Sequence, residues 1–81
     1  MKVTILGCGA YALSLSLMFY KNTKNITLWT KVEEEKESLL KTRRNEKALP
    51  GIQIPEEIKV TSNLKEAIED TSLIVFAIPA K

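Results

Sequence analysis

Two glycines near the start of the chain have the spacing of a phosphate-binding turn. Gly7 and Gly9 flank a single residue, and Ala12 follows three positions later, in the segment GCGAYA. In such a turn the first glycine permits a sharp change of direction, the second leaves room for a pyrophosphate, and the third small residue lets a helix pack closely on the strand. The free N–H groups of that helix would bind the phosphates without a basic side chain. The spacing therefore indicates a nucleotide site, with a plain structural turn as the alternative.

The segments around this turn follow the order that a nucleotide site needs. Residues 2–6 form a nearly continuous apolar run, and the residues after the glycines carry apolar side chains at helical spacing. The predicted elements are, in order, strand 2–6, helix 10–20, strand 26–29, helix 31–44, strand 58–61, helix 63–70 and strand 73–78. Strands that alternate with helices predict right-handed crossovers and a parallel sheet.

These elements predict an α/β fold, a Rossmann-like open parallel sheet of about four strands in the order 3-2-1-4 with helices on both faces. The run at 73–78 is uniformly apolar, which is typical of a strand covered on both faces. With no further strand beside it, we expect this strand to be the sheet edge and its side chains Ile74, Val75, Phe76 and Ile78 to be partly bare. Copies of the chain would then associate through it, which predicts a homo-oligomer.

The composition excludes several other classes of function. With 81 residues the chain holds one small domain, and its 44% hydrophobic and 27% charged residues fit a globular protein without a membrane span or signal peptide. The 12 basic and 10 acidic residues are mixed along the chain, so the basic patch of a nucleic-acid binder is missing. One cysteine and no histidine argue against a disulfide framework, a zinc site and triad chemistry. We expect no metal and a cytoplasmic location.

The end of the second predicted strand bears on which dinucleotide binds. An acidic residue ~20 positions after the glycines would hold the ribose 2′-hydroxyl of NAD. The chain instead has Trp29, Thr30 and Lys31 there. Lys31 would meet the 2′-phosphate of NADP, helped by Arg43 or Arg44 if the second helix turns them inward. The sequence slightly favours NADP over NAD, and the alternative is that Lys31 is an ordinary surface lysine.

Two further residues of the turn have more than one interpretation. Cys8 lies between the glycines, where a small packing residue fits. The alternative is a reactive thiol whose pKa is lowered by the helix N-terminus. Tyr11 would either lie over the cofactor or anchor the neighbouring loop.

The segments GCGAYA, LWTK, RRNEKALPGI and IVFAIPA, at their separations here, resemble the N-terminal part of the NAD(P)-dependent glycerol-3-phosphate dehydrogenases. The most specific part of this resemblance comprises Arg44, Asn45, Leu49, Pro50 and Gly51. The resemblance spans the whole chain. It implies reversible hydride transfer between a nicotinamide cofactor and glycerone phosphate, giving the glycerol 3-phosphate used in phospholipid synthesis.

Position by position, the resemblance matches Ala10, Tyr11 and Lys31 to cofactor contacts. Together with the glycine turn, the expected cofactor-binding set is Gly7, Gly9, Ala10, Tyr11, Ala12 and Lys31. The family's catalytic lysine and substrate residues lie in a later helical domain, so we expect residues 1–81 to be the N-terminal part of a dinucleotide-binding domain, without a catalytic residue and inactive alone. The alternatives are a relative of ketopantoate reductase or 6-phosphogluconate dehydrogenase, and a noncatalytic nucleotide-binding module.

Overall fold

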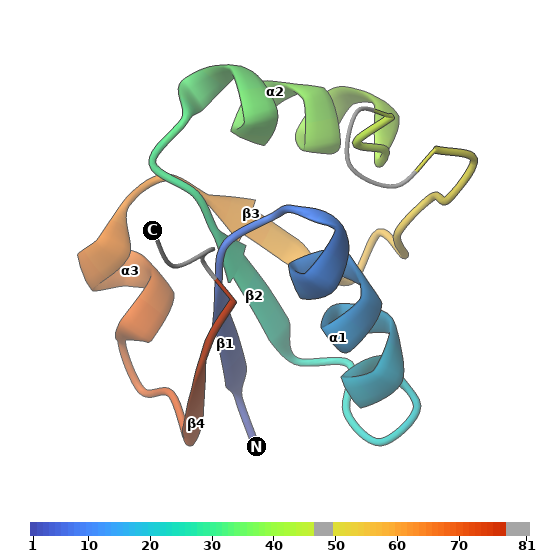
Figure 1. Ribbon diagram of the computed structural model, residues 1–81. Coiled ribbons are helices and arrows are strands. Elements are labelled where there is room, and N and C mark those ends of the chain that lie inside the picture. The colour runs from blue at the N-terminus through green and yellow to red at the C-terminus, as the bar shows by residue number, and fades with distance from the viewer. Residues whose placement is uncertain (47–49, 78–81) are drawn as a thin grey trace.

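A computed structural model describes residues 1–46 and 50–77 of the chain (Figure 1). Four strands alternate with three helices, as the sequence predicts. The elements are β1 (Val3–Leu6), α1 (Ala10–Tyr20), β2 (Ile26–Trp29), α2 (Glu33–Thr42), β3 (Lys59–Thr61), α3 (Leu64–Ile68) and β4 (Leu73–Phe76). Of the predicted positions, Leu49 and Ile78 lie outside the described residues.

The four strands form one parallel sheet in the order β3-β2-β1-β4, which confirms the predicted order. Right-handed crossovers in this order place α1 and α2 on one face and α3 on the other. The contacts agree, because α1 packs on β1 and β2 whereas α3 packs on β2 and β3. Figure 1 shows α1 and α3 on opposite sides of the sheet. The predicted open sheet with helices on both faces is therefore confirmed.

The core lies between the sheet and the α1–α2 layer. Its fully buried side chains are Val3, Ile5, Leu13, Ile26, Leu28, Leu39 and Ile58. All four residues of β1 are buried, as expected for a central parallel strand covered on both faces. Alternate residues of β1 and β2 face α3 instead, and these include Thr4 and Thr27, which are paired in register.

The second helix is shorter than predicted at both ends. It begins after Val32, whose N–H donates to the Thr30 hydroxyl in a short local turn. It ends at Arg43, which adopts a left-handed conformation with φ 61° and donates its N–H to the Leu39 carbonyl. By contrast, the predicted start of α3 is confirmed, because the Asn63 side chain accepts the N–H of Glu66 at 3.0 Å.

The last strand is exposed rather than covered on both faces. Within the described sheet β4 pairs only with β1, so it forms an edge. Leu73 and Ile74 are about two-fifths exposed and Phe76 is 75% exposed, while Val75 packs partly against the core. The expectation of a partly bare apolar edge is confirmed for the described residues of this strand.

The two threonines on the α3 face predict opposite responses to the same substitution. The Thr4 hydroxyl lies 2.7 Å from both the Ala67 carbonyl and the Thr71 hydroxyl, whereas the buried Thr27 hydroxyl has no partner among the described residues. We expect Thr4→Val to lower the free energy of unfolding by about 1–3 kcal/mol, because the buried Ala67 carbonyl loses this donor. The Thr71 hydroxyl keeps the Lys2 and Leu73 carbonyls as partners. Thr27→Val should leave that free energy unchanged or raise it. Urea denaturation of both variants measures the difference, and equal effects would contradict this account.

Candidate functional site

The turn between β1 and α1 uses its two glycines for different reasons. Gly7 has φ 133°, a conformation that side chains rarely adopt, and its N–H donates to the Trp29 carbonyl at 2.6 Å. Gly9 has φ −77° and ψ −171°, which any residue can adopt. A Cβ atom built on Gly9 would meet nothing within 4 Å. The fold therefore needs glycine at position 7, whereas at position 9 the missing side chain leaves open space beside the helix start.

The start of α1 presents unpaired backbone donors to this space. The first helical bond runs from the Leu13 N–H to the Gly9 carbonyl at 3.0 Å. Among the described residues, no acceptor is recorded for the N–H groups from Gly9 to Ala12. The first turn carries no acidic side chain. Free N–H groups and the positive end of the helix dipole favour an anion at this position.

The three residues after Gly9 lie in different environments. Ala12 is fully buried against the sheet, so the prediction that a small residue here permits close packing of α1 is confirmed. Ala10 and Tyr11 are exposed on the first turn, and the Tyr11 side chain is 66% exposed. Their exposure leaves both accessible to a ligand, and their role in cofactor binding stays a prediction.

The structure does not bring the predicted basic residues together at the end of β2. Lys31 is exposed just beyond β2, but Arg43 and Arg44 lie at the far end of α2, a helix about 15 Å long. Arg43 donates to the Ile58 and Glu56 carbonyls, and Arg44 pairs with Glu46. The suggestion that Arg43 assists Lys31 is wrong, because its guanidinium is bonded to these loop carbonyls. Arg44 lines the same hollow as Val32 and Glu35, and its assistance to Lys31 stays a prediction.

Cys8 is a buried, protonated thiol rather than a reactive one. Its Sγ donates to Oε1 of Glu35 at 3.1 Å, and its backbone carbonyl accepts the side-chain amide of Asn45 at 2.9 Å. Burial, followed by the hydrogen bond to the Glu35 carboxylate, raises the pKa of the Cys8 thiol to about 12. The alternative of a thiol with a lowered pKa is therefore wrong, because burial and the neighbouring carboxylate both raise the pKa of this thiol.

Glu35 is the residue of this site that the sequence did not reveal. Its Oε1 accepts both the Cys8 thiol and the Thr30 hydroxyl, the latter at 2.9 Å, so its carboxylate lies between the glycine turn and the end of β2. In the sequence it belongs to an acidic run that resembles an ordinary solvated helix face. The signal in the sequence that could have identified Glu35 is its position shortly after strand 26–29, where an acidic residue can reach the end of that strand.

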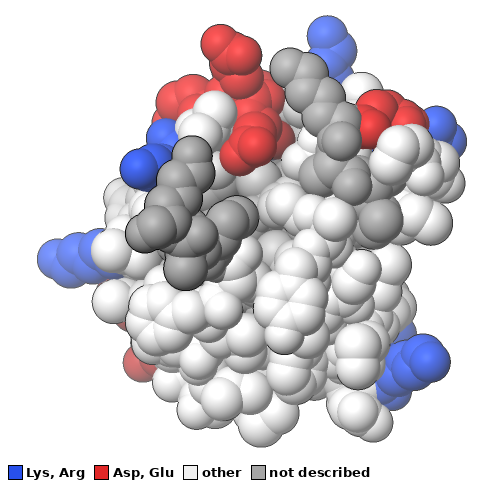
Figure 2. All heavy atoms as spheres, in the orientation of Figure 1, with Lys and Arg blue, Asp and Glu red and all other residues white. Residues whose placement is uncertain are grey.

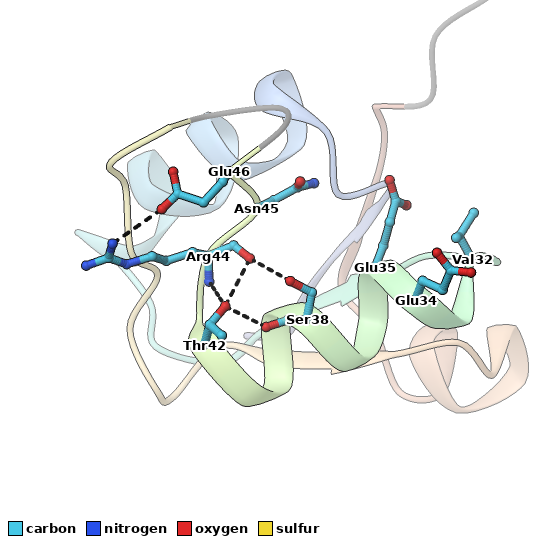
Figure 3. A pocket seen from close by; sticks show the side chains of 8 residues that line it. All are labelled: Val32, Glu34, Glu35, Ser38, Thr42, Arg44, Asn45 and Glu46. Carbon is cyan, nitrogen blue, oxygen red and sulfur yellow. Dashed lines mark hydrogen bonds and ion pairs between the residues drawn. The ribbon is translucent and has the colours of Figure 1, made fainter.

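A hollow of about 770 Å³ adjoins Glu35 and Asn45 (Figure 3). Its lining residues are Val32, Glu34, Glu35, Ser38, Thr42, Arg44, Asn45 and Glu46. Figure 3 shows Glu35 rising from α2 while Asn45 extends from the following loop. The walls thus offer carboxylate, amide and hydroxyl groups, which suit a ligand rich in hydroxyl groups.

The rest of the described surface has a second hollow of about 440 Å³, lined by residues that include Lys2, Arg43 and Glu66. Figure 2 shows acidic side chains gathered over the region of α2, whereas the face below it is largely uncharged. Residues 1–46 and 50–77 contain no cluster of three or more side chains suited to holding a metal. No helix in these ranges combines the length and apolar character needed to cross a membrane.

The raised pKa of Cys8 predicts a pH-dependent stability. The thiol ionises in the unfolded chain near its ordinary pKa of 9.0 but stays protonated in the folded chain up to about 12. Its contribution is fully present below pH 9.0 and is lost as pH rises from there toward 12. We expect the difference in unfolding free energy between the native chain and Cys8→Ala to shrink over this range. Denaturation curves at several pH values test this, and a constant difference would contradict it.

Known proteins that resemble this chain belong to one family of nicotinamide-dependent dehydrogenases. A family model described as NAD-dependent glycerol-3-phosphate dehydrogenase N-terminus matches residues 2–81. The chain is 40% identical over 80 residues to a glycerol-3-phosphate dehydrogenase [NAD(P)+] of Fusobacterium nucleatum, covering 99% of this chain and 24% of that protein. It is 38% identical to one from Lactobacillus delbrueckii, covering 98% of this chain and 23% of that protein. The chain thus spans about a quarter of the length of these relatives.

Solved structures show the same fold. The glycerol-3-phosphate dehydrogenase of Plasmodium falciparum superposes with a TM-score of 0.84 at 30% identity, over 98% of this chain and 25% of that chain. The enzyme named GPD1 from Saccharomyces cerevisiae superposes with a TM-score of 0.82 at 26% identity, over 98% of this chain and 26% of that one. Since the family model covers nearly every residue, the chain belongs to the NAD-dependent glycerol-3-phosphate dehydrogenase family, in its N-terminal part.

Proposed function

We propose that the chain binds the nicotinamide dinucleotide NAD or NADP at the turn between β1 and α1. The open space at Gly9 carries this proposal, because neither its backbone angles nor its packing requires a glycine. A pyrophosphate beside the free N–H groups of α1 accounts for the missing side chain. The proposed cofactor-binding residues are Gly7, Gly9, Ala10, Tyr11, Ala12 and Lys31.

For the complete protein we propose the reversible reduction of glycerone phosphate to sn-glycerol 3-phosphate by hydride transfer. Family membership supports this activity, as does the name that the similar proteins share, glycerol-3-phosphate dehydrogenase [NAD(P)+]. The product would supply phospholipid synthesis in the cytoplasm. Residues 1–81 would form the N-terminal part of the dinucleotide-binding domain, and the catalytic groups would lie elsewhere in a protein of the relatives' length. The family match favours this activity over the ketopantoate reductase and 6-phosphogluconate dehydrogenase alternatives.

Gly9→Val in the complete gene product tests the proposed site. We expect affinity for the reduced dinucleotides to fall roughly hundredfold or more, because the branched side chain would fill the space of the pyrophosphate. The unfolding temperature should fall by only a few degrees, because the new Cβ meets no neighbour although valine is a poorer N-cap than glycine. Calorimetry measures binding, and absorbance of the reduced nicotinamide follows its oxidation by glycerone phosphate.

Ser14→Val provides the matched control for Gly9→Val. Ser14 is exposed on the same helix, so this variant places the same valine side chain away from the turn and should bind normally. Unchanged binding by Gly9→Val would remove the site from this turn. An unaltered protein that binds both dinucleotides but fails to oxidise them with glycerone phosphate would contradict the proposed activity while leaving the binding site intact.

We also propose that copies of the chain associate through β4. Phe76 and Leu73 are exposed on this edge, and its outer backbone groups have no strand partner in the described sheet. The neighbouring helix α1 carries no charged residue and exposes Met18. In Figure 2 the face below α2 is largely uncharged. A second copy offers the same apolar edge, so the contact would be self-complementary.

We expect Phe76→Lys to weaken this association of copies through β4. A charge at the most exposed apolar position of β4 should shift the chain from dimer toward monomer in sedimentation equilibrium. Ile52→Lys is the control, because Ile52 is also an exposed apolar residue but lies in the loop before β3. A native chain that stays monomeric at high concentration, or equal effects of both variants, would refute the proposal.

A further inference from the structure

We infer that Glu35 determines cofactor preference and makes the site favour NAD over NADP. This inference rests on the proposed dinucleotide site at the glycine turn. It assigns to a residue of α2 the task of binding the adenosine ribose, and it reverses the slight preference for NADP drawn from Lys31 alone. The argument depends on where the carboxylate lies, how firmly it is held and which charges surround it.

The Glu35 carboxylate occupies the junction that frames the ribose in folds of this kind. Its Oε1 accepts the Thr30 hydroxyl, one residue beyond β2, and the thiol of Cys8 between the two glycines. In open parallel sheets an acid at the end of the second strand binds the ribose 2′-hydroxyl while the pyrophosphate lies on the glycine turn. Glu35 therefore brings a carboxylate to the end of β2, where the sequence itself has no acidic residue.

The carboxylate is fixed and still has capacity for a ligand. Two hydrogen bonds hold Oε1, and no donor is recorded for Oε2 within residues 1–46 and 50–77. Neither ion pair found in those residues involves Glu35. An ionised carboxyl group accepts about four hydrogen bonds, so ribose hydroxyls can be added to the two donors already bound.

Lys31 does not offset this carboxylate in the described structure. Its side chain is exposed, and no hydrogen bond or ion pair of Lys31 with any described residue is recorded. Binding a 2′-phosphate through Lys31 would require ordering a long flexible side chain, whereas Glu35 is already held by two bonds. Glu34 and Glu46 line the same hollow, and the Arg44 beside them is paired with Glu46. The local charge is thus unfavourable to a phosphate dianion at the ribose.

Glu35→Gln in the complete gene product tests the inference, with Kd for NADH and NADPH measured by calorimetry. The carboxamide oxygen can still accept from Thr30 and Cys8, so the change removes the charge with little change of shape. We expect NADPH to bind roughly tenfold tighter and NADH to bind more weakly, because repulsion of the 2′-phosphate is lost together with a charged acceptor. Glu37→Gln removes a charge from α2 at an exposed residue that does not line the hollow, and it should leave the ratio of the two Kd values unchanged.

Competition on the unaltered protein gives a second measurement that does not depend on a variant folding. We expect AMP to displace NADH more effectively than adenosine 2′,5′-bisphosphate, which differs from AMP only by the 2′-phosphate. The inference would be overturned if the ratio of the Kd for NADH to the Kd for NADPH were the same in Glu35→Gln and the unaltered protein. It would also be overturned if adenosine 2′,5′-bisphosphate displaced NADH more effectively. Either result would leave the proposed function standing. Failure of the unaltered protein to bind either dinucleotide would overturn the proposed function itself.

Discussion

The hydrogen bond from the Gly7 N–H to the Trp29 carbonyl ties the carboxyl end of β1 to that of β2, and the candidate site depends on it. It extends the parallel pairing of the two strands by one residue into the turn. Only the positive φ of Gly7 allows the chain to leave the sheet sharply at this point and enter α1. The free N–H groups of the helix therefore face the edge of the sheet at which the neighbouring strand also ends.

The second crossover then completes the surroundings of the turn. Because α2 lies on the same face of the sheet as α1, its first turn brings the Glu35 carboxylate against Cys8. The loop after α2 returns Asn45 to the Cys8 carbonyl, and the base of that loop is held by the bonds of Arg43 to the Glu56 and Ile58 carbonyls. The residue between the two glycines is thus bound through both its side chain and its backbone. This gives a rigid turn, and a preorganised site loses less entropy when a ligand binds.

The three small residues of the glycine turn have different structural roles. Gly7 serves the backbone, Ala12 serves the packing of α1 on the sheet, and Gly9 serves neither in the described structure. The matching family model is described as NAD-dependent, which agrees with the proposal of a pyrophosphate beside Gly9. On the other side of β1 from β2, the edge strand β4 leaves apolar side chains in solvent, although its sequence is that of a buried strand. At both places, Gly9 and the exposed apolar side chains of β4, the described fold alone does not explain the type of residue found.

The sequence by itself determined the features that depend on neighbouring residues. Alternation of apolar runs and helical spacing was enough for the element order. The Rossmann-like pattern that these elements form with the glycine turn then predicted the strand order. The glycine spacing located the turn, and the Asn63 cap located the start of α3. These are short-range effects of backbone conformation and side-chain periodicity, so they can be seen in a window of a few residues.

Only the tertiary structure decided the chemistry around the turn. Cys8 and Glu35 are 27 residues apart, and Cys8 and Asn45 are 37 apart, so their contacts exist only after α2 has packed beside α1. The pKa of the Cys8 thiol follows from that packing, because burial and a neighbouring carboxylate are properties of the assembled site. The separation of Arg43 from Lys31 was equally invisible in the sequence, since it depends on where α2 ends and how the left-handed residue redirects the chain.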